Sequence, residues 1–174
     1  MLTRNYKNVV ASIIAKTSAN YTGLPVKAIN GNTYYLNAAL ISFPQTATTS
    51  FSRSVSAAGI QVGSGDTPVS ESDYKLDNMV TNSSVTGSVN ISRTLEDGKL
   101  YIIFDLTITN GSSDTIQIKE IGYSQYLSSG TTQAGTVVSS AYCFMLDRTV
   151  LDTPVSIAAG DFATIRYKLG SSVD

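Results

Sequence analysis

The feature that most constrains this fold is an unbroken alternation of apolar and polar residues over 100–109, LYIIFDLTIT. Every second residue from Leu100 to Ile108 is a large apolar one, and the residues between them are mostly polar. A period of two predicts a β-strand with one face toward a core and the other toward water. Asp97-Gly98 just before it favours a tight hairpin turn.

The neighbouring segments extend this pattern into a meander of SVNISRTL, LYIIFDLTITN and GSSDTIQIKEIG. Ile116 and Ile118 continue the buried face, but Glu120 stands where an apolar residue is due. This break predicts a β-bulge or a strand end at KEIG. In the last strand, Ala163, Ile165, Tyr167 and Leu169 alternate toward the core in the same way.

Further strands are expected on both sides of the meander. Asn30-Gly31 predicts a two-residue hairpin turn, in which both residues have positive φ, between strands 25–29 and 33–43. One or two short strands are expected in 51–63 and a late one in VVSSAYCFML. The other segments are predicted as connections, namely loops at 44–50 and 128–136, a link over 77–87 with at most one short strand, and turns at 152–154 and 160–161.

The only helix predicted spans 3–16. Tyr6, Val9, Val10, Ile13 and Ile14 share one face, and Thr3 is a candidate N-cap. Packing of this helix on a sheet of the same chain is the default expectation, and docking into a partner subunit is the alternative.

About eight to ten short strands separated by turn signals are typical of an all-β protein. We predict an antiparallel β-sandwich, jelly-roll or Ig-like, with one short N-terminal α-helix. The division expected is 1–22 for the helix and linker and 23–174 for the sandwich domain.

Composition restricts function more than it restricts fold. Charged residues make up only 14% of the chain, against about 25% in an average domain, so charge repulsion protects the surface weakly against association. This is compatible with an assembly component and equally with an ordinary all-β domain. The net charge is −1 and no basic block exists, so we expect no nucleic-acid partner.

The chain has no histidine and one cysteine, Cys143. A Ser-His-Asp triad, a Cys-His pair and imidazole metal ligands are therefore excluded. Cys143 lies in the apolar run SAYCFML and is predicted to be a small buried hydrophobe, in keeping with folding in a reducing cytosol. The N-terminal apolar run VVASIIA is short and no A-x-A site follows, so neither export nor a membrane span is expected.

Residues 59–76, GIQVGSGDTPVSESDYKL, resemble a phosphate loop at first sight. Pro68 stands where the third glycine of a dinucleotide fingerprint is needed, no Gly-Lys-Ser/Thr occurs, and no long helix follows. Gly63 and Gly65 are therefore expected to serve backbone shape rather than a ligand.

The carboxylates of the same stretch, Asp66, Glu71, Asp73 and Asp77, lack the spacing of an EF-hand loop, which leaves only a looser calcium site open. The preferred interpretation is a capped helical turn. In it, Ser70 and Asp73 form a capping box.

Glu120 is the one carboxylate that the pattern directs inward. A hydrolase based on Asp and Glu would give it a perturbed pKa and a catalytic role. The favoured interpretation is that Glu120 pairs with an arginine or accepts backbone hydrogen bonds at the bulge.

Three segments in order, VGSGDTPVSESDYKL, IKEIGYSQYL and LDRTVLDTPVSIAAGDFATIRYKL, resemble small β-rich virion proteins of tailed bacteriophages, such as head-fibre, neck or tail-ring, or tail accessory proteins. The opening MLTRNYKNVVASII is similar as well. The chain departs from this pattern at 122–124, where the family more often has an apolar residue after the glycine. The resemblance implies a structural, non-enzymatic role in the virion, with no catalytic residue, cofactor or metal.

The expected partners are copies of the same chain and other virion proteins, with synthesis in the bacterial cytoplasm and no membrane or small-molecule ligand. Tyr74, Leu76, Ile121 and Pro154 are predicted to be structural anchors. The alternative function is a carbohydrate-binding or receptor-binding module at a virion tip. Ten tyrosines permit it, but the absence of tryptophan weakens it.

Overall fold

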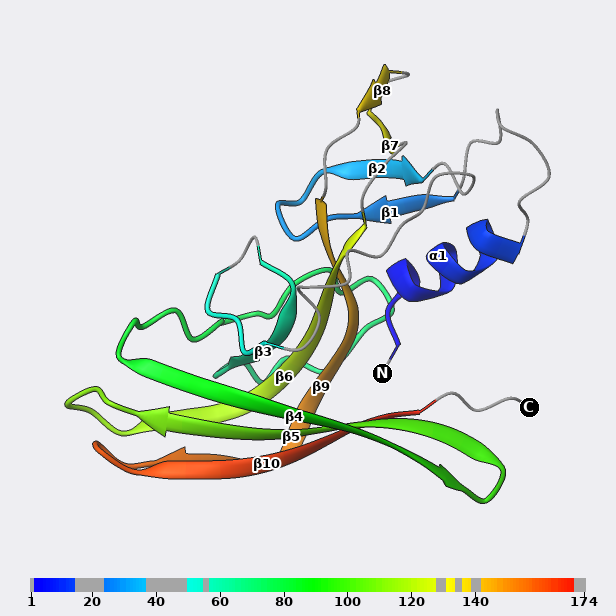
Figure 1. Cartoon of the computed structure of the whole chain (residues 1–174). Helices are drawn as coiled ribbons and strands as arrows, with labels where there is room; N and C mark the ends of the chain where they lie inside the picture. Colours follow the sequence, from blue (N-terminus) through cyan, green and yellow to red (C-terminus); the bar gives the residue numbers. More distant parts are fainter. Residues whose placement is uncertain are drawn as a thin grey trace.

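The computed structural model describes residues 2–14, 24–36, 50–54, 57–127, 131–133, 136–138 and 142–170. These residues form one helix, α1 (Arg4–Ile14), and ten strands (Figure 1). The strands are β1 (Pro25–Lys27), β2 (Thr33–Leu36), β3 (Gly59–Gly63), β4 (Val85–Glu96), β5 (Lys99–Asn110), β6 (Ile116–Leu127), β7 (Thr131–Gln133), β8 (Thr136–Val138), β9 (Tyr142–Ile157) and β10 (Phe162–Gly170).

The strands make three antiparallel sheets, ordered β1-β2-β7-β8, β10-β5-β4 and β3-β6-β9. The described part of the chain is therefore all-β with one short helix, which confirms that level of the prediction. No helix in this part is long and apolar enough to cross a membrane.

The β4–β5 hairpin is the longest regular feature, with an unbroken register from Val85↔Asn110 to Glu96↔Lys99. Asp97 and Gly98 have φ values of 50° and 74°, so both central residues of the turn lie in the left-handed region. This is the conformation that the Asp-Gly pair predicts for a type I′ turn.

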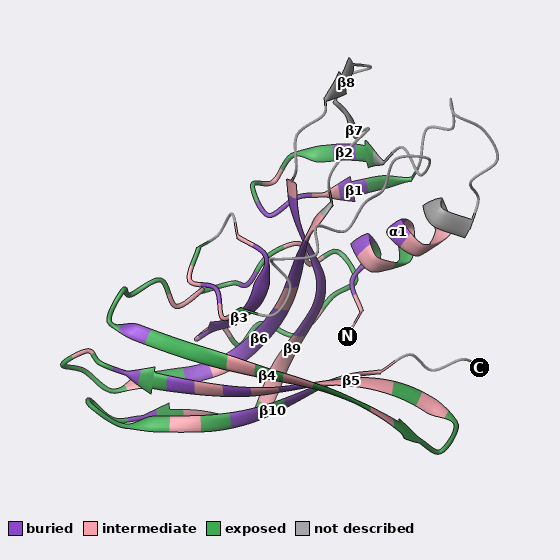
Figure 2. Cartoon of the chain, viewed as in Figure 1, coloured by how far each residue is buried: buried purple, intermediate pink, exposed green. Residues whose placement is uncertain are grey.

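The two three-stranded sheets share one hydrophobic core. Of the β5 residues predicted to face inward, Phe104, Leu106 and Ile108 are buried, whereas Ile102 is half-buried and Leu100, near the turn, is exposed. Ile165 and Tyr167 of β10 lie beside the buried residues. Figure 2 shows this burial as purple bands along β3, β5, β6 and β9, whereas β4 is mostly exposed. The buried members are Ile60, Val62, Val85, Phe104, Leu106, Ile108, Ile118, Ile121, Ile157, Ile165 and Tyr167.

The register between β6 and β9 shifts between Ile118 and Glu120, which confirms the predicted bulge at KEIG. β6 continues beyond it to Leu127, so the strand does not end there. On β9, residues 151–154 stand opposite Lys119 alone, and Pro154 lies in this bulge. Proline is tolerated at a bulge because no ladder hydrogen bond is needed from its nitrogen.

A second, smaller core holds helix α1 against β1 and β9. Val9 is buried there with Val26, Tyr34 and Phe144, so the helix packs within its own chain, as expected by default. The hydroxyl of Thr3 accepts a hydrogen bond from the Tyr6 N–H, as predicted for an N-cap, and donates one to the Met145 carbonyl. The helix is described to Ile14, and its predicted end at 16 and the boundary at 22–23 lie outside the described residues.

Three local predictions were wrong. Only Gly31 has a positive φ in the first hairpin, and its N–H donates to the Ala28 carbonyl. This geometry is a longer loop with one left-handed residue rather than a two-residue turn. Residues 152–154, predicted as a turn, lie inside β9, and β7 lies inside the predicted loop 128–136, where it pairs with β2.

Candidate functional site

The three segments that carry the family resemblance meet at Glu120, although they are far apart in the sequence. Glu120 is completely buried, and each of its oxygens accepts two hydrogen bonds. Oε1 accepts the N–H groups of Gly65 at 3.1 Å and Asn78 at 2.9 Å. Oε2 accepts the N–H of Asp77 at 3.1 Å and Nε of Arg148 at 2.9 Å. All four lone-pair directions of the carboxylate therefore have a protein donor.

Arg148 is the second buried charge, with a side chain only 1% exposed. Besides Glu120, its guanidinium donates to Asp73 Oδ2 at 2.8 Å, Asp77 Oδ2 at 2.8 Å and the Thr67 carbonyl at 3.2 Å. We call Arg148, Glu120, Asp73 and Asp77 the Arg148 cluster. Burial opposes the arginine's charge, but hydrogen bonds and attraction from Asp73 and Glu120 outweigh it and raise the pKa of Arg148.

The Arg148 cluster fixes residues 64–79, which we call the 64–79 segment, onto β6 and β9. The segment contributes two carboxylates, a carbonyl and three N–H groups to the two buried side chains. It also reaches helix α1, because Arg4 N–H donates to the Glu71 carbonyl and Lys7 pairs with the Glu71 carboxylate. The segment therefore connects the helix to the larger core.

Gly63 and Gly65 serve backbone shape, as predicted. A Cβ at Gly63 would collide with Oε1 of Glu120 and lie 2.6 Å from the Asn78 carbonyl oxygen. A Cβ at Gly65 would lie 2.6 Å from the same Glu120 oxygen. Only glycine leaves room for the carboxylate at both positions.

The four acidic residues of this segment are divided among three cations rather than gathered at one point. Asp66 pairs with Lys119 and Glu71 with Lys7, while Asp73 and Asp77 bind Arg148. Within the described residues, no group of three metal-ligating side chains converges. The lysines hold the pKa values of Asp66 and Glu71 below their usual range through hydrogen bonds and charge.

The predicted capping box forms only in part. Asp73 accepts the Ser70 N–H at 2.9 Å, which is one of the two hydrogen bonds of a capping box. The Ser70 hydroxyl, however, accepts the Ser72 N–H rather than the N–H of Asp73. The segment makes a turn here and no helix. The principal partner of Asp73 is Arg148, a contact that local sequence rules cannot supply.

Two of the four predicted anchors are buried. Leu76 and Ile121 are 3% and 1% exposed, and a Cβ on Gly122 would lie 2.9 Å from the Leu76 side chain. Tyr74 is half-buried, with the Lys27 ammonium 3.9 Å above its ring. Pro154 is exposed, so its prediction as an anchor was wrong: it occupies the β9 bulge.

A second pair of buried polar groups lies next to the cluster. Asp147, 4% exposed, accepts a hydrogen bond from the Tyr167 hydroxyl. Burial and the Asp147 charge raise the pKa of Tyr167 well above its usual value. Neither the burial of Asp147 nor the role of Arg148 is predicted above, although DR directly after the apolar run YCFML was the signal for buried charge.

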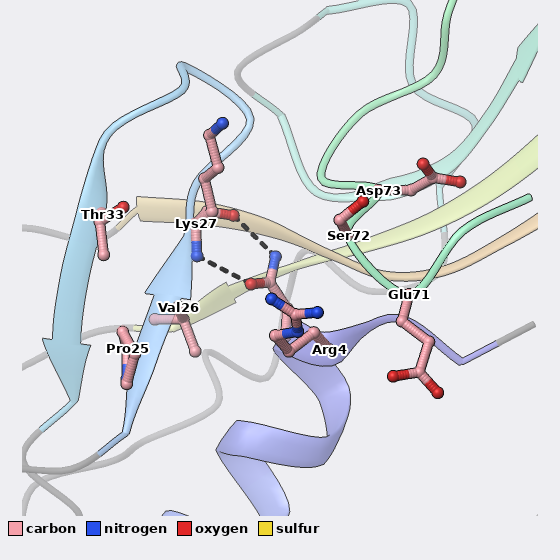
Figure 3. Close-up of a pocket in the computed structure, with 9 residues that line it drawn as sticks. Arg4, Pro25, Val26, Lys27, Thr33, Glu71, Ser72 and Asp73 are labelled. Atoms are coloured by element: carbon pink, nitrogen blue, oxygen red, sulfur yellow. Dashed lines mark hydrogen bonds between the residues drawn. The ribbon is translucent and has the colours of Figure 1, made fainter.

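A surface pocket of about 300 Å³ adjoins the Arg148 cluster (Figure 3). Residues of α1, β1, β2 and the 64–79 segment line it, and two of them, Glu71 and Asp73, already pair with Lys7 and Arg148. The dashed lines in Figure 3 mark the two hydrogen bonds by which Asn5 of helix α1 is joined to the backbone of Lys27 on β1. None of the described residues that line the pocket is aromatic, so they offer no stacking platform of the kind typical of a sugar site.

Cys143 is buried beside Ile29 and Ala58, as predicted. Burial raises the pKa of its thiol to about 12, so the thiolate is scarce at neutral pH. The described arrangement is thus one of charged groups that pair within the chain and fix backbone geometry. Comparison of the chain with protein-family models, curated proteins and solved structures found no match.

Proposed function

We propose that this protein is a non-enzymatic structural component of a tailed bacteriophage virion, a head, neck or tail accessory protein that acts through oligomeric assembly. The observation that carries the proposal is the convergence of all three resembling segments in the Arg148 cluster. The first supplies Asp73 and the donor Gly65, the second supplies Glu120, and the third supplies Arg148.

This convergence supports a structural role because the cluster's hydrogen-bonding capacity is used within the chain. Glu120 accepts four protein donors and Arg148 donates to four protein oxygens. A catalytic acid or base needs an atom within reach of a substrate, whereas these two side chains are 0% and 1% exposed. Segments that converge in such a cluster fix the shape of the chain around it.

The same proposal includes the architecture. Two three-stranded antiparallel sheets over one core support a β-sandwich of the jelly-roll or Ig-like kind. A rigid sandwich presents edges and hairpins to neighbouring subunits, and a symmetric particle repeats each modest contact many times. Copies of the chain and other virion proteins are the proposed partners.

The test is mass spectrometry of purified phage particles, combined with the oligomeric state of the recombinant protein. The expected result is a stoichiometric copy number in the particle and a symmetric oligomer in solution. A monomer that is absent from particles would overturn the proposal. Specific binding of the purified protein on a glycan array would instead support the carbohydrate-binding alternative.

A further inference from the structure

The two three-stranded sheets have four outer edges, and residues of the same chain hydrogen-bond along two of them. Along β3, Ser52 N–H donates to the Ile60 carbonyl and Val80 N–H donates to the Val62 carbonyl. Along the first half of β9, Thr3 N–H and Ile29 N–H donate to the Leu146 and Cys143 carbonyls. These two edges cannot accept a further strand there without displacing part of the fold.

The remaining two edges are β10 and β4, on opposite sides of one sheet. β10 carries Arg166 and Lys168, both exposed, and basic side chains are a common protection of edge strands. β4 has no charged residue, proline or bulge from Val85 to Ser92, and its register with β5 is regular throughout. Among the described strands of these two sheets, β4 is therefore the long edge strand that lacks the features by which edge strands avoid pairing.

The turn geometry shows which backbone groups of β4 face outward. In a two-residue I′ hairpin, the residues flanking the turn, Glu96 and Lys99, form a hydrogen-bonded pair, and such pairs then alternate along the ladder. Even-numbered residues of β4 therefore bond to β5, and odd-numbered ones direct their N–H and C=O outward. Val85 agrees, because its N–H donates to the Asn82 carbonyl instead of to β5.

Near its turn, the core-facing side of the same hairpin is also exposed. Leu95 and Leu100 are directly opposite each other, yet they are 71% and 57% exposed. As far as the structure describes it, β10 extends to Gly170, which lies opposite Tyr101. Figure 1 shows the turn end of the hairpin projecting past the other strands. An open edge and an uncovered apolar pair thus occur on one element.

We propose that β4 pairs antiparallel with β4 of a second copy about a two-fold axis, joining two three-stranded sheets into one of six strands. The inference rests on the proposed function for its setting in a particle. The distribution of charge selects a second copy as the occupant. With the axis at residue 90, 91 or 92, Arg93 faces Gly87, Val89 or Ile91 of the second copy, and Glu96 faces Ser84, Thr86 or Ser88.

No like charges therefore meet in these registers, and Leu95 faces Val85, Gly87 or Val89 of the other copy. The outer face then brings together hydroxyl and amide side chains such as Asn90 and Ser92. Cross-strand pairs of these types are favourable or neutral. The pairing satisfies outward backbone groups and covers part of the exposed Leu95.

The first experiment compares the full-length protein with Asn90→Lys/Ser92→Lys by sedimentation equilibrium. Both side chains are exposed on the outer face, so the change adds two charges per copy at the axis without altering the core. The wild type is expected to be a dimer or a multiple of it, and the variant to raise the dimer Kd about tenfold or more. Ser156→Lys/Thr164→Lys, with equal charge on exposed positions of β9 and β10, is expected to leave the Kd unchanged.

The second experiment reads the register with single cysteines at 88, 90, 92 and 94. A symmetric pair centred at 90 or 92 brings that position opposite its own copy, so Asn90→Cys or Ser92→Cys is expected to form a disulfide dimer under mild oxidation. Thr164→Cys is the control and is expected to stay uncrosslinked. A wild-type monomer at all concentrations, or an oligomer unaffected by the lysines and without crosslinking, would overturn the proposal.

The outcomes separate this inference from the proposed function. A protein present in particles whose assembly ignores the β4 variants would refute strand pairing and leave the virion role intact. A β4-dependent dimer that never enters particles would refute the virion role and leave strand pairing intact.

Discussion

Arg148 and Glu120 form a buried ion pair in which Nε of Arg148 lies 2.9 Å from Oε2 of Glu120. One residue is on β9 and the other on β6, and neither side chain is more than 1% exposed. The pair is the anchor of the 64–79 segment.

Replacing Arg148 with methionine is expected to reduce the free energy of unfolding by about 3–5 kcal/mol, because Glu120 would keep a buried charge without its cation. Urea denaturation gives the value. Arg166→Met is the matched control: its ion pair with Asp105 is largely exposed, so this substitution is expected to lower stability far less than Arg148→Met. Equal effects of the two substitutions would contradict the burial argument.

Gly63→Ala is expected to destabilise the protein by roughly 1–3 kcal/mol, because the new Cβ meets Glu120 and the backbone of Asn78. Thermal unfolding monitored by circular dichroism measures the change. Thr67→Ala, an exposed position in the same segment, serves as the control and is expected to be near neutral. A ligand-binding role for the glycine would instead leave stability unaltered.

Tyr167 gives a pH prediction. Burial and the Asp147 charge raise its pKa in the folded state, so the folded protein holds the phenolic proton more tightly than the unfolded chain. The stability from this group is complete below the unfolded pKa of about 10 and is lost as pH rises toward the folded value. Tyr167→Phe is expected to flatten the alkaline fall in urea midpoint. The exposed Tyr35→Phe should retain it.

Cys143 is expected to resist alkylation in the native protein at about pH 8, since its pKa is raised to about 12 and the thiol is buried. In denaturant the same thiol should react completely, because the unfolded pKa is about 8.5. Mass spectrometry after iodoacetamide treatment measures both states. Rapid labelling of the folded protein would mean that this part of β9 opens readily.

The sequence by itself determined the features that depend on neighbouring residues. The alternation over 100–109 defined the buried face of β5, Asp97-Gly98 defined its turn, and Glu120 marked the bulge. Side-chain period and backbone φ preference act locally, so a single sequence contains them.

Only the tertiary structure decided which distant groups meet. Three features depend on how β6, β9 and the 64–79 segment approach one another. The first is the choice of Arg148 as the partner of Glu120, and the second is the pairing of Asp66, Glu71, Asp73 and Asp77 with cations from other parts of the chain. The third is the exposed position of Pro154. Electrostatic pairing acts through space between residues far apart in the chain, and no local pattern specifies that approach.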